Sequence, residues 1–288
     1  MFSRFLRYSV MLLAVTLLLA ACAGDARNDT PAEQATEVVE AKEEVVEAQE
    51  EAVDALSLAG TYWKLEFIGE PSDDLPVLPE TRPTVAYAVD RYGGFGGCNY
   101  FLGVYTADAS SLRMNTPAST MSGCEPPEVM SQEGTFSSAL VNTTEYKMEG
   151  ANLVMYTVGE QRMLTMSPAE APPFEGTTWE LKFVWDESYW APTLIDSKPT
   201  AIFAGDQMSG SGGCNTYSAT VTLTENRMVI GPAASTMMAC AEPEGVMEQE
   251  SVYFTTLESV AGYEQLGDLL LLLSGEGYPI LAFGAVVE

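Results

Sequence analysis

Apolar and polar residues alternate along several short stretches of this chain, and these stretches recur in its second half. In the first, Thr61 to Phe67, the residues Trp63, Leu65 and Phe67 share one face, as they do in a half-buried β-strand. The alternation predicts strands at 61–67, 83–89, 101–106, 111–115, 153–157 and 163–166, and again at 177–183, 199–203, 217–223, 227–230, 269–273 and 280–283.

In each half of the chain, the spacing of apolar residues changes once from that of a strand to that of a helix. After a proline-containing segment, Val129, Phe136 and Leu140 follow one another at helical spacing, and Val246, Tyr253 and Leu257 repeat that spacing. The pattern therefore predicts one amphipathic helix in each half, within a domain that is otherwise built from strands.

A sequence motif marks the duplication most sharply. Gly-Gly-Cys-Asn occurs at 96–99 and 212–215, and both copies are followed at equal distance by Ser-Thr-Met and a second cysteine. A period this long indicates two copies of one domain, expected at 58–167 and 174–288 with a linker at 168–173. We expect 93–97 and 210–213 to be glycine-rich turns. The residues expected to support the turns are Gly97, Asn99, Gly213 and Asn215. Such a turn can also present backbone N–H groups to an anion, although no P-loop sequence follows.

The N-terminus has the pattern of an export signal. Arg4 and Arg7 precede an apolar run that is too short for a membrane span, and the run ends in Leu-Ala-Ala-Cys at 19–22. This ending resembles the lipobox of bacterial lipoproteins. The resemblance implies a signal peptide at 1–21, a lipid anchor on Cys22 and, since no aspartate follows, an outer-membrane location facing the periplasm or the cell surface. An ordinary signal with a chance cysteine is the alternative.

The segment 22–57 is rich in Glu, Ala and Val and contains three seven-residue repeats from Glu37 to Ser57. Small residues at the expected seam and dense negative charge predict a solvated, partly helical stalk, with a weak coiled coil as the alternative.

Composition excludes several kinds of function. The chain of 288 residues has 41 acidic and 13 basic residues and no histidine. A net charge of −28 disfavours nucleic acid as a partner. The absence of histidine removes Ser-His-Asp catalysis and imidazole metal sites. We therefore expect no catalytic residue, no metal and no cofactor.

Four cysteines remain after Cys22. The repeat pairs Cys98 with Cys124 and Cys214 with Cys240, and export supplies an oxidising compartment. A four-cysteine metal site is the rival, but the cysteines lack the CxxC spacing of such sites.

Taken together, Gly-Thr-x-Trp, Gly-Cys-Asn and Ser-Thr-Met-x-x-Cys resemble the META domain family of HslJ-like proteins, over about 57–167 and 174–288. The resemblance implies two tandem, small lipocalin-like β-barrels, each with one helix. It also implies a role in the cell envelope and in stress response, without known enzymatic chemistry. In the first copy Met-Ser-Gly precedes the second cysteine, a small departure from the family pattern.

The two copies differ in their first loop, which in the second copy contains Trp185, Tyr189 and Trp190. Exposed aromatic residues can stack on sugars or anchor a protein, so these residues are the candidate contact surface. The structural alternative is that they close a barrel end or pack on the first domain.

The sequence thus predicts a non-enzymatic envelope lipoprotein that binds a protein or a glycan, or that buffers the envelope under stress. Two alternatives stay open: a carrier that holds one small apolar ligand inside a barrel, and a hydrolase that uses carboxylates alone.

Overall fold

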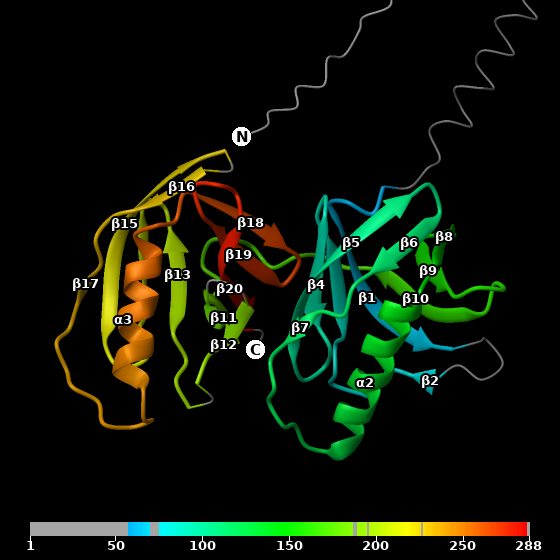
Figure 1. Cartoon of the computed structure of the whole chain (residues 1–288), viewed down its shortest axis with the longest axis horizontal. Helices are drawn as coiled ribbons and strands as arrows, with labels where there is room; N and C mark the ends of the chain where they lie inside the picture. The colour runs from blue at the N-terminus through cyan, green and yellow to red at the C-terminus, as the bar shows by residue number, and fades with distance from the viewer. Residues whose placement is uncertain (1–56, 70–74, 187–188, 195, 226, 287–288) are drawn as a thin grey trace, which may run out of the picture. The chain divides into compact units, whose positions relative to one another are not determined.

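The computed structural model of the chain describes residues 57–69, 75–186, 189–194, 196–225 and 227–286 (Figure 1). Within these ranges the protein is mainly β, with two antiparallel sheets and two helices. No helix in the described part is long and apolar enough to cross a membrane. The predicted signal peptide, Cys22 and all but the last residue of the predicted stalk lie outside the described residues.

The first repeat contains the strands β1 (Thr61–Ile68), β2 (Leu75–Pro76), β3 (Thr84–Tyr87), β4 (Arg91–Phe95), β5 (Tyr100–Asp108), β6 (Ser111–Met114), β7 (Ala118–Ser119), β8 (Glu145–Glu149), β9 (Asn152–Tyr156) and β10 (Arg162–Pro168). They pair in the order β1-β3-β4-β5-β6-β8-β9-β10, and β10 pairs back onto β1. The sheet therefore closes on itself, as expected for a small barrel.

The second repeat contains β11 (Trp179–Asp186), β12 (Tyr189–Pro192), β13 (Thr200–Ala204), β14 (Gln207–Ser211), β15 (Thr216–Thr224), β16 (Arg227–Ile230), β17 (Ala234–Ser235), β18 (Gly262–Leu266), β19 (Leu269–Leu273) and β20 (Pro279–Ala285). Its order, β11-β13-β14-β15-β16-β18-β19-β20 and back to β11, reproduces the first circuit. The mainly β fold with two tandem domains is confirmed.

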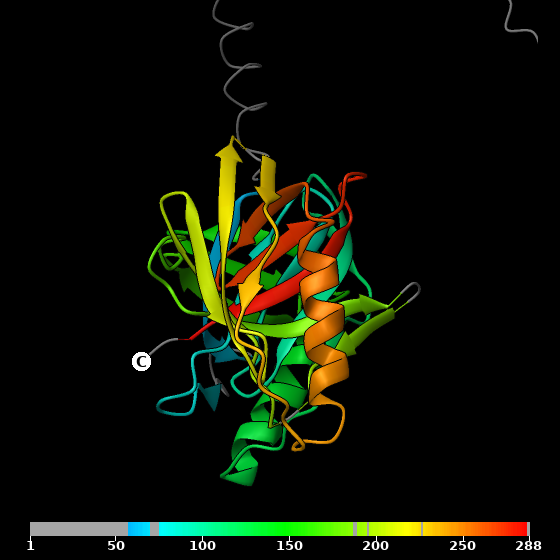
Figure 2. The same cartoon turned by 90° about the vertical axis from the view of Figure 1, so that its left-hand side faces the viewer.

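One helix packs on each sheet, α2 (Pro127–Asn142) and α3 (Val246–Leu257). Phe136 and Leu140 of α2 enter the core of the first sheet, and Tyr253 and Leu257 of α3 enter the core of the second. Figure 2 shows α3 lying along the strands of its sheet. The helical spacing read from the sequence thus marks the residues that each helix buries.

The glycine-rich segments were expected as turns, and this is wrong for their first residues. Gly94 lies inside β4 and Gly210 inside β14. A Cβ atom on Gly94 would lie 2.2 Å from the carbonyl oxygen of Thr84, and one on Gly210 would lie 2.0 Å from that of Thr200. At these two positions glycine is needed because a neighbouring strand comes too close for a side chain, and not because the backbone turns there.

The structure also contains strands that the sequence pattern missed. In β8 only Tyr146 is buried, so no apolar alternation marks this strand, and β18 is similarly polar. The loop expected around Trp185 is instead a hairpin, because β11 pairs with β12 and Trp185 lies opposite Trp190.

The two repeats share a third core. Along β19, Leu270 and Leu272 point into the core of the second sheet, whereas Leu269 and Leu271 belong to a cluster shared with the first repeat. Successive side chains of a strand point to opposite faces, so the leucines of β19 pack alternately into two different cores. The shared cluster is formed by Ala86, Ala88 and Leu102 of the first repeat and Phe183, Leu266, Leu269, Leu271 and Ala282 of the second.

Candidate functional site

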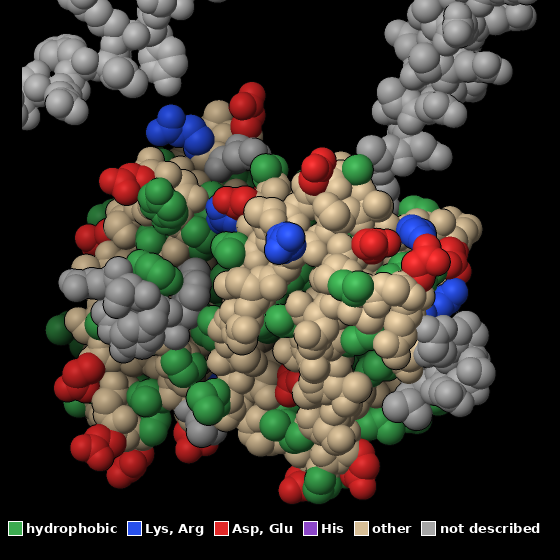
Figure 3. Space-filling model, turned by 45° about the vertical axis from the view of Figure 1, so that its right-hand side comes forward, with side chains coloured by type: hydrophobic (Ala, Val, Ile, Leu, Met, Phe, Trp, Pro, Cys, Tyr) green, Lys and Arg blue, Asp and Glu red, His purple; other side chains and the backbone are tan. Residues whose placement is uncertain are grey.

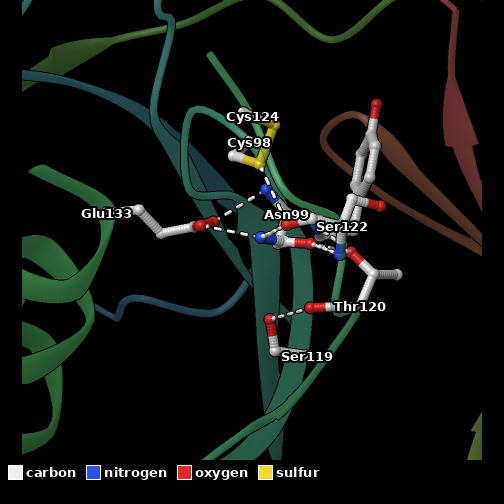
Figure 4. Close-up of a disulfide and its surroundings, with 8 residues drawn as sticks. Cys98, Asn99, Ser119, Thr120, Ser122, Cys124 and Glu133 are labelled. Atoms are coloured by element: carbon white, nitrogen blue, oxygen red, sulfur yellow. Dashed lines mark hydrogen bonds between the residues drawn. A yellow bond between two sulfur atoms is a disulfide. The ribbon is translucent and has the colours of Figure 1, made fainter. Parts of the chain in front are cut away.

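The Gly-Gly-Cys-Asn turn of each repeat is built around its asparagine. In the first repeat Asn99 is 4% exposed, and its Oδ1 accepts hydrogen bonds from the Thr120 hydroxyl and the Ser122 N–H, both at 2.8 Å (Figure 4). Its Nδ2 donates to the Ser122 carbonyl at 3.2 Å and to the Glu133 carboxylate at 2.8 Å. One side chain therefore ties the turn, the loop before α2 and the helix together.

The same asparagine forms the same contacts in the second repeat. Asn215 accepts hydrogen bonds from the Thr236 hydroxyl and the Met238 N–H, and donates to Glu250 at 2.6 Å. The turn does hold an anion, since Glu250 Oε2 accepts the Asn215 N–H at 2.6 Å and the Cys214 N–H at 3.1 Å. This anion is the protein's own carboxylate, so the turn N–H groups are already used within the domain.

The helix supplies a second anchor beside each glutamate. Gln132 Oε1 accepts the Leu78 N–H at 2.7 Å, and Gln249 Oε1 accepts the Leu194 N–H at 2.7 Å. Sequence reasoning missed these residues, although a Gln-Glu pair ahead of an aromatic residue is visible in both copies.

Both predicted disulfides are confirmed. Cys98 bonds Cys124 and Cys214 bonds Cys240, each with a Cα–Cα distance of 5.9 Å. Beside them Gly97 has a φ of 109° and Gly213 a φ of 117°, a backbone region in which glycine is favoured. In each repeat the glycine thus gives the turn its backbone conformation beside the disulfide.

One residue of the candidate contact surface, Trp185, lies at a groove of about 850 Å³ whose walls come from both repeats. Trp185 lines it and is 39% exposed, and Tyr278, which was not singled out from the sequence, is 65% exposed. Tyr189 and Trp190 continue the hairpin in β12, but their side chains lie outside the described part. The signal that could have identified Tyr278 is an aromatic residue in the Gly-rich turn between β19 and β20.

Acidic, basic and neutral polar residues all line the groove. Asp90, Asn115 and Glu276 line it, together with Arg91. The Arg91 guanidinium is already engaged, since its Nε donates to Asp90 at 2.9 Å and its Nη1 lies 3.6 Å from Glu264. Burial raises the pKa of the Glu264 carboxyl, partly offset by Arg91. Figure 3 shows acidic side chains scattered over the visible face rather than gathered in one patch.

The described residues contain no group of three or more Asp, Glu, Cys or His side chains that could hold a metal ion. The carboxylates of the half-buried Glu133 and the buried Glu250 accept hydrogen bonds from the turns, and the buried carboxylate of Asp268 lies between the repeats.

The family model of the META domain matches residues 56–170 and again 172–286. The chain belongs to the META domain family. Two NMR structures of proteins are similar to it, each at 21% identity. The match to the first covers 38% of this chain and 89% of the chain in that structure, with a TM-score of 0.31. The other, from Burkholderia xenovorans, covers 42% of this chain and 96% of its own, with a TM-score of 0.33. No curated protein sequence matches the chain.

Proposed function

We propose that this tandem META domain protein is a non-enzymatic binding module of the bacterial cell envelope, and that its partner is a glycan held in the groove between the repeats. The observation that carries the proposal is the exposed aromatic pair Trp185 and Tyr278 in a groove lined by both domains. Aromatic faces pack on the apolar C–H faces of sugar rings. The volume of the groove, about 850 Å³, lies within the range of small-molecule sites.

The polar lining fits the hydroxyl groups of a sugar. Asp90 and Glu276 offer carboxylate oxygens as acceptors, and Asn115 offers an amide that both donates and accepts. The net charge of −28 opposes binding of an anionic polymer. The favoured ligand is therefore a neutral glycan or one with amino groups.

The envelope location rests on the N-terminal pattern and on the cysteines. Arg4, Arg7 and the Leu-Ala-Ala-Cys ending support export and a lipid on Cys22, in an outer-membrane lipoprotein facing the periplasm or the cell surface. Disulfides persist in oxidising compartments, so the two bridges agree with export.

Two features support binding over the alternatives. Glu133 and Glu250 already accept hydrogen bonds from the turns, which leaves them unsuited to hydrolysis. Packed side chains occupy the core of each closed sheet, so no observation favours a carrier of a small apolar ligand.

Calorimetry of the purified chain with chito-oligosaccharides, both acetylated and deacetylated, tests the groove. We expect binding that weakens at least tenfold in Trp185→Ala and in Tyr278→Ala, since an anchoring aromatic residue contributes about 2 kcal/mol or more. Val158→Ala, an exposed position that does not line the groove, is the matched control. Equal affinities in all variants, or capture of a protein at Trp185 with no glycan bound, would reject the glycan.

Metabolic labelling with an alkyne fatty acid tests the anchor independently. We expect label on the native chain in the membrane fraction and none on Cys22→Ser. An unlabelled, unmodified thiol at position 22 in the exported protein contradicts the lipoprotein assignment without affecting the groove.

A further inference from the structure

The contact between the two repeats contains a carboxylate that is almost fully removed from water. Asp268, in the turn between β18 and β19, is 7% exposed. Its Oδ2 accepts a hydrogen bond of 2.7 Å from the hydroxyl of Thr84, so the bond crosses from the second repeat to β3 of the first. Its Oδ1 is buried and has no hydrogen-bond partner among the described residues.

The first repeat closes over this carboxylate with tyrosine rings. A Cβ atom on Gly267 would lie 2.4 Å from the ring of Tyr62, and one on Gly284 would lie 2.4 Å from the ring of Tyr100. The Tyr100 hydroxyl also donates to the Ala285 carbonyl at 2.9 Å. The glycines of the second repeat thus admit the tyrosines of the first, and Asp268 is left 7% exposed at the wall of a cavity of about 600 Å³.

Several charged and titratable groups lie near Asp268. Those that share its cavity of about 600 Å³, or lie beside Tyr100, are Tyr62 and Lys64 of β1, Glu80 and Arg82 before β3, Tyr100 of β5, Glu170 after β10, and Glu180 and Lys182 of β11. Lys64 pairs with Glu66 at 3.0 Å and Lys182 with Glu180 at 2.6 Å. Within the described part, no cation forms an ion pair with Asp268.

Burial without a cation favours the neutral acid. It raises the pKa of the Asp268 carboxyl from 3.8 to about 6, although the nearby hydroxyls of Thr84 and Tyr62 lower it in part. In a state with the repeats apart, water would reach the carboxyl and its pKa would return towards the ordinary value. The joined state would then bind a proton that the separated state releases.

We propose that the contact between the repeats is a pH-dependent clasp, in which protonation of Asp268 tightens the contact and ionisation loosens it. The stabilisation is complete below the pKa of the separated state and is lost as the pH rises through that of the joined state. With pKa values of about 6 and 3.8, the equilibrium constant for joining falls about tenfold between pH 5 and pH 8. The clasp regulates the proposed groove, whose walls come from both repeats, but it does not depend on what binds there.

The first repeat supplies a matched pair of variants. Its residue at the position of Asp268 is Asn152, the first residue of β9, which directly precedes Leu153, so the fold accepts asparagine there. Asp268→Asn removes the titrating group, and Asn152→Asp adds one outside the contact. Glu264, whose pKa is also raised by burial, is a second carboxyl at the contact between the repeats, beside Arg91.

The full-length chain in detergent is tested by carbon-13 carboxyl NMR and by thermal unfolding from pH 5 to pH 8. We expect Asp268 to titrate near pH 6, the unfolding temperature of the native chain to fall as pH rises, and Asp268→Asn to lose most of that fall. Asn152→Asp should keep the native profile.

A titration midpoint below about pH 4.5, or a native pH profile in Asp268→Asn, overturns the clasp. If Asp268→Asn does not fold, the NMR midpoint of the native chain decides alone. Glycan affinity enters neither measurement, so failure of the clasp and failure of the groove are separate results.

Discussion

Removal of the Glu250 carboxylate should destabilise the second repeat strongly, because this group is the acceptor on which the Gly-Gly-Cys-Asn turn depends. Glu250 is 4% exposed and accepts hydrogen bonds from the Cys214 N–H, the Asn215 N–H and the Asn215 side chain, at 3.1, 2.6 and 2.6 Å. Glu250→Ala leaves the Cys214 and Asn215 N–H groups without this acceptor, and the Asn215 side chain keeps only its hydrogen bond to the Met238 carbonyl at 3.2 Å.

The magnitude follows from these three bonds. A buried donor left without a partner costs about 1 to 3 kcal/mol, and donors that share one acceptor do not add independently. We therefore expect Glu250→Ala to lower the free energy of unfolding by about 3 to 5 kcal/mol, a large share of the roughly 5 to 15 kcal/mol of a typical domain. Glu250→Gln keeps one acceptor oxygen and should lower the free energy of unfolding by less.

Urea unfolding of the oxidised protein, followed by tryptophan fluorescence, measures this loss, since Trp179 is buried in the second core. Glu248→Ala is the control: it removes an exposed carboxylate from the first turn of the same helix and should cost at most about 1 kcal/mol. A loss below about 1 kcal/mol in Glu250→Ala would refute the view that this carboxylate holds the turn.

Three further outcomes are expected from urea midpoints. Gly210→Ala should cost on the order of 1 to 3 kcal/mol, because its Cβ would lie 2.0 Å from the Thr200 carbonyl oxygen; an unchanged midpoint would contradict this close approach. Gly134→Ala, at an open position of α2, should instead stabilise by about 0.5 to 1 kcal/mol, and a loss would mean that the helix surface there is occupied. Replacing Cys214 and Cys240 together by serine should lower stability by about 3 to 4 kcal/mol, since their bridge spans 26 residues; a midpoint equal to that of the native chain would show that the bridge is dispensable.

Some features of this protein are determined locally and can be read from the sequence. Alternation correctly places Trp63 and Leu65 of β1 on one buried face, and helical spacing reports which residues of α2 are buried, because both depend on backbone geometry. The expectation is wrong for Phe67, which is 39% exposed because a bulge between Leu65 and Phe67 interrupts the alternation. The equal spacing of the two motifs was enough to pair Cys98 with Cys124 and Cys214 with Cys240.

Other features are decided by contacts between residues far apart in the chain. Alternation does not say what covers each face of a strand, so the second role of Leu269 and Leu271 emerged only with the neighbouring repeat in place. Glu250 and Gln249 resemble ordinary helix surface residues until the fold brings buried N–H donors to them. The burial of Asp268 likewise exists only where Thr84 and Tyr62 of the other repeat close over it, because desolvation is a property of the assembled contact.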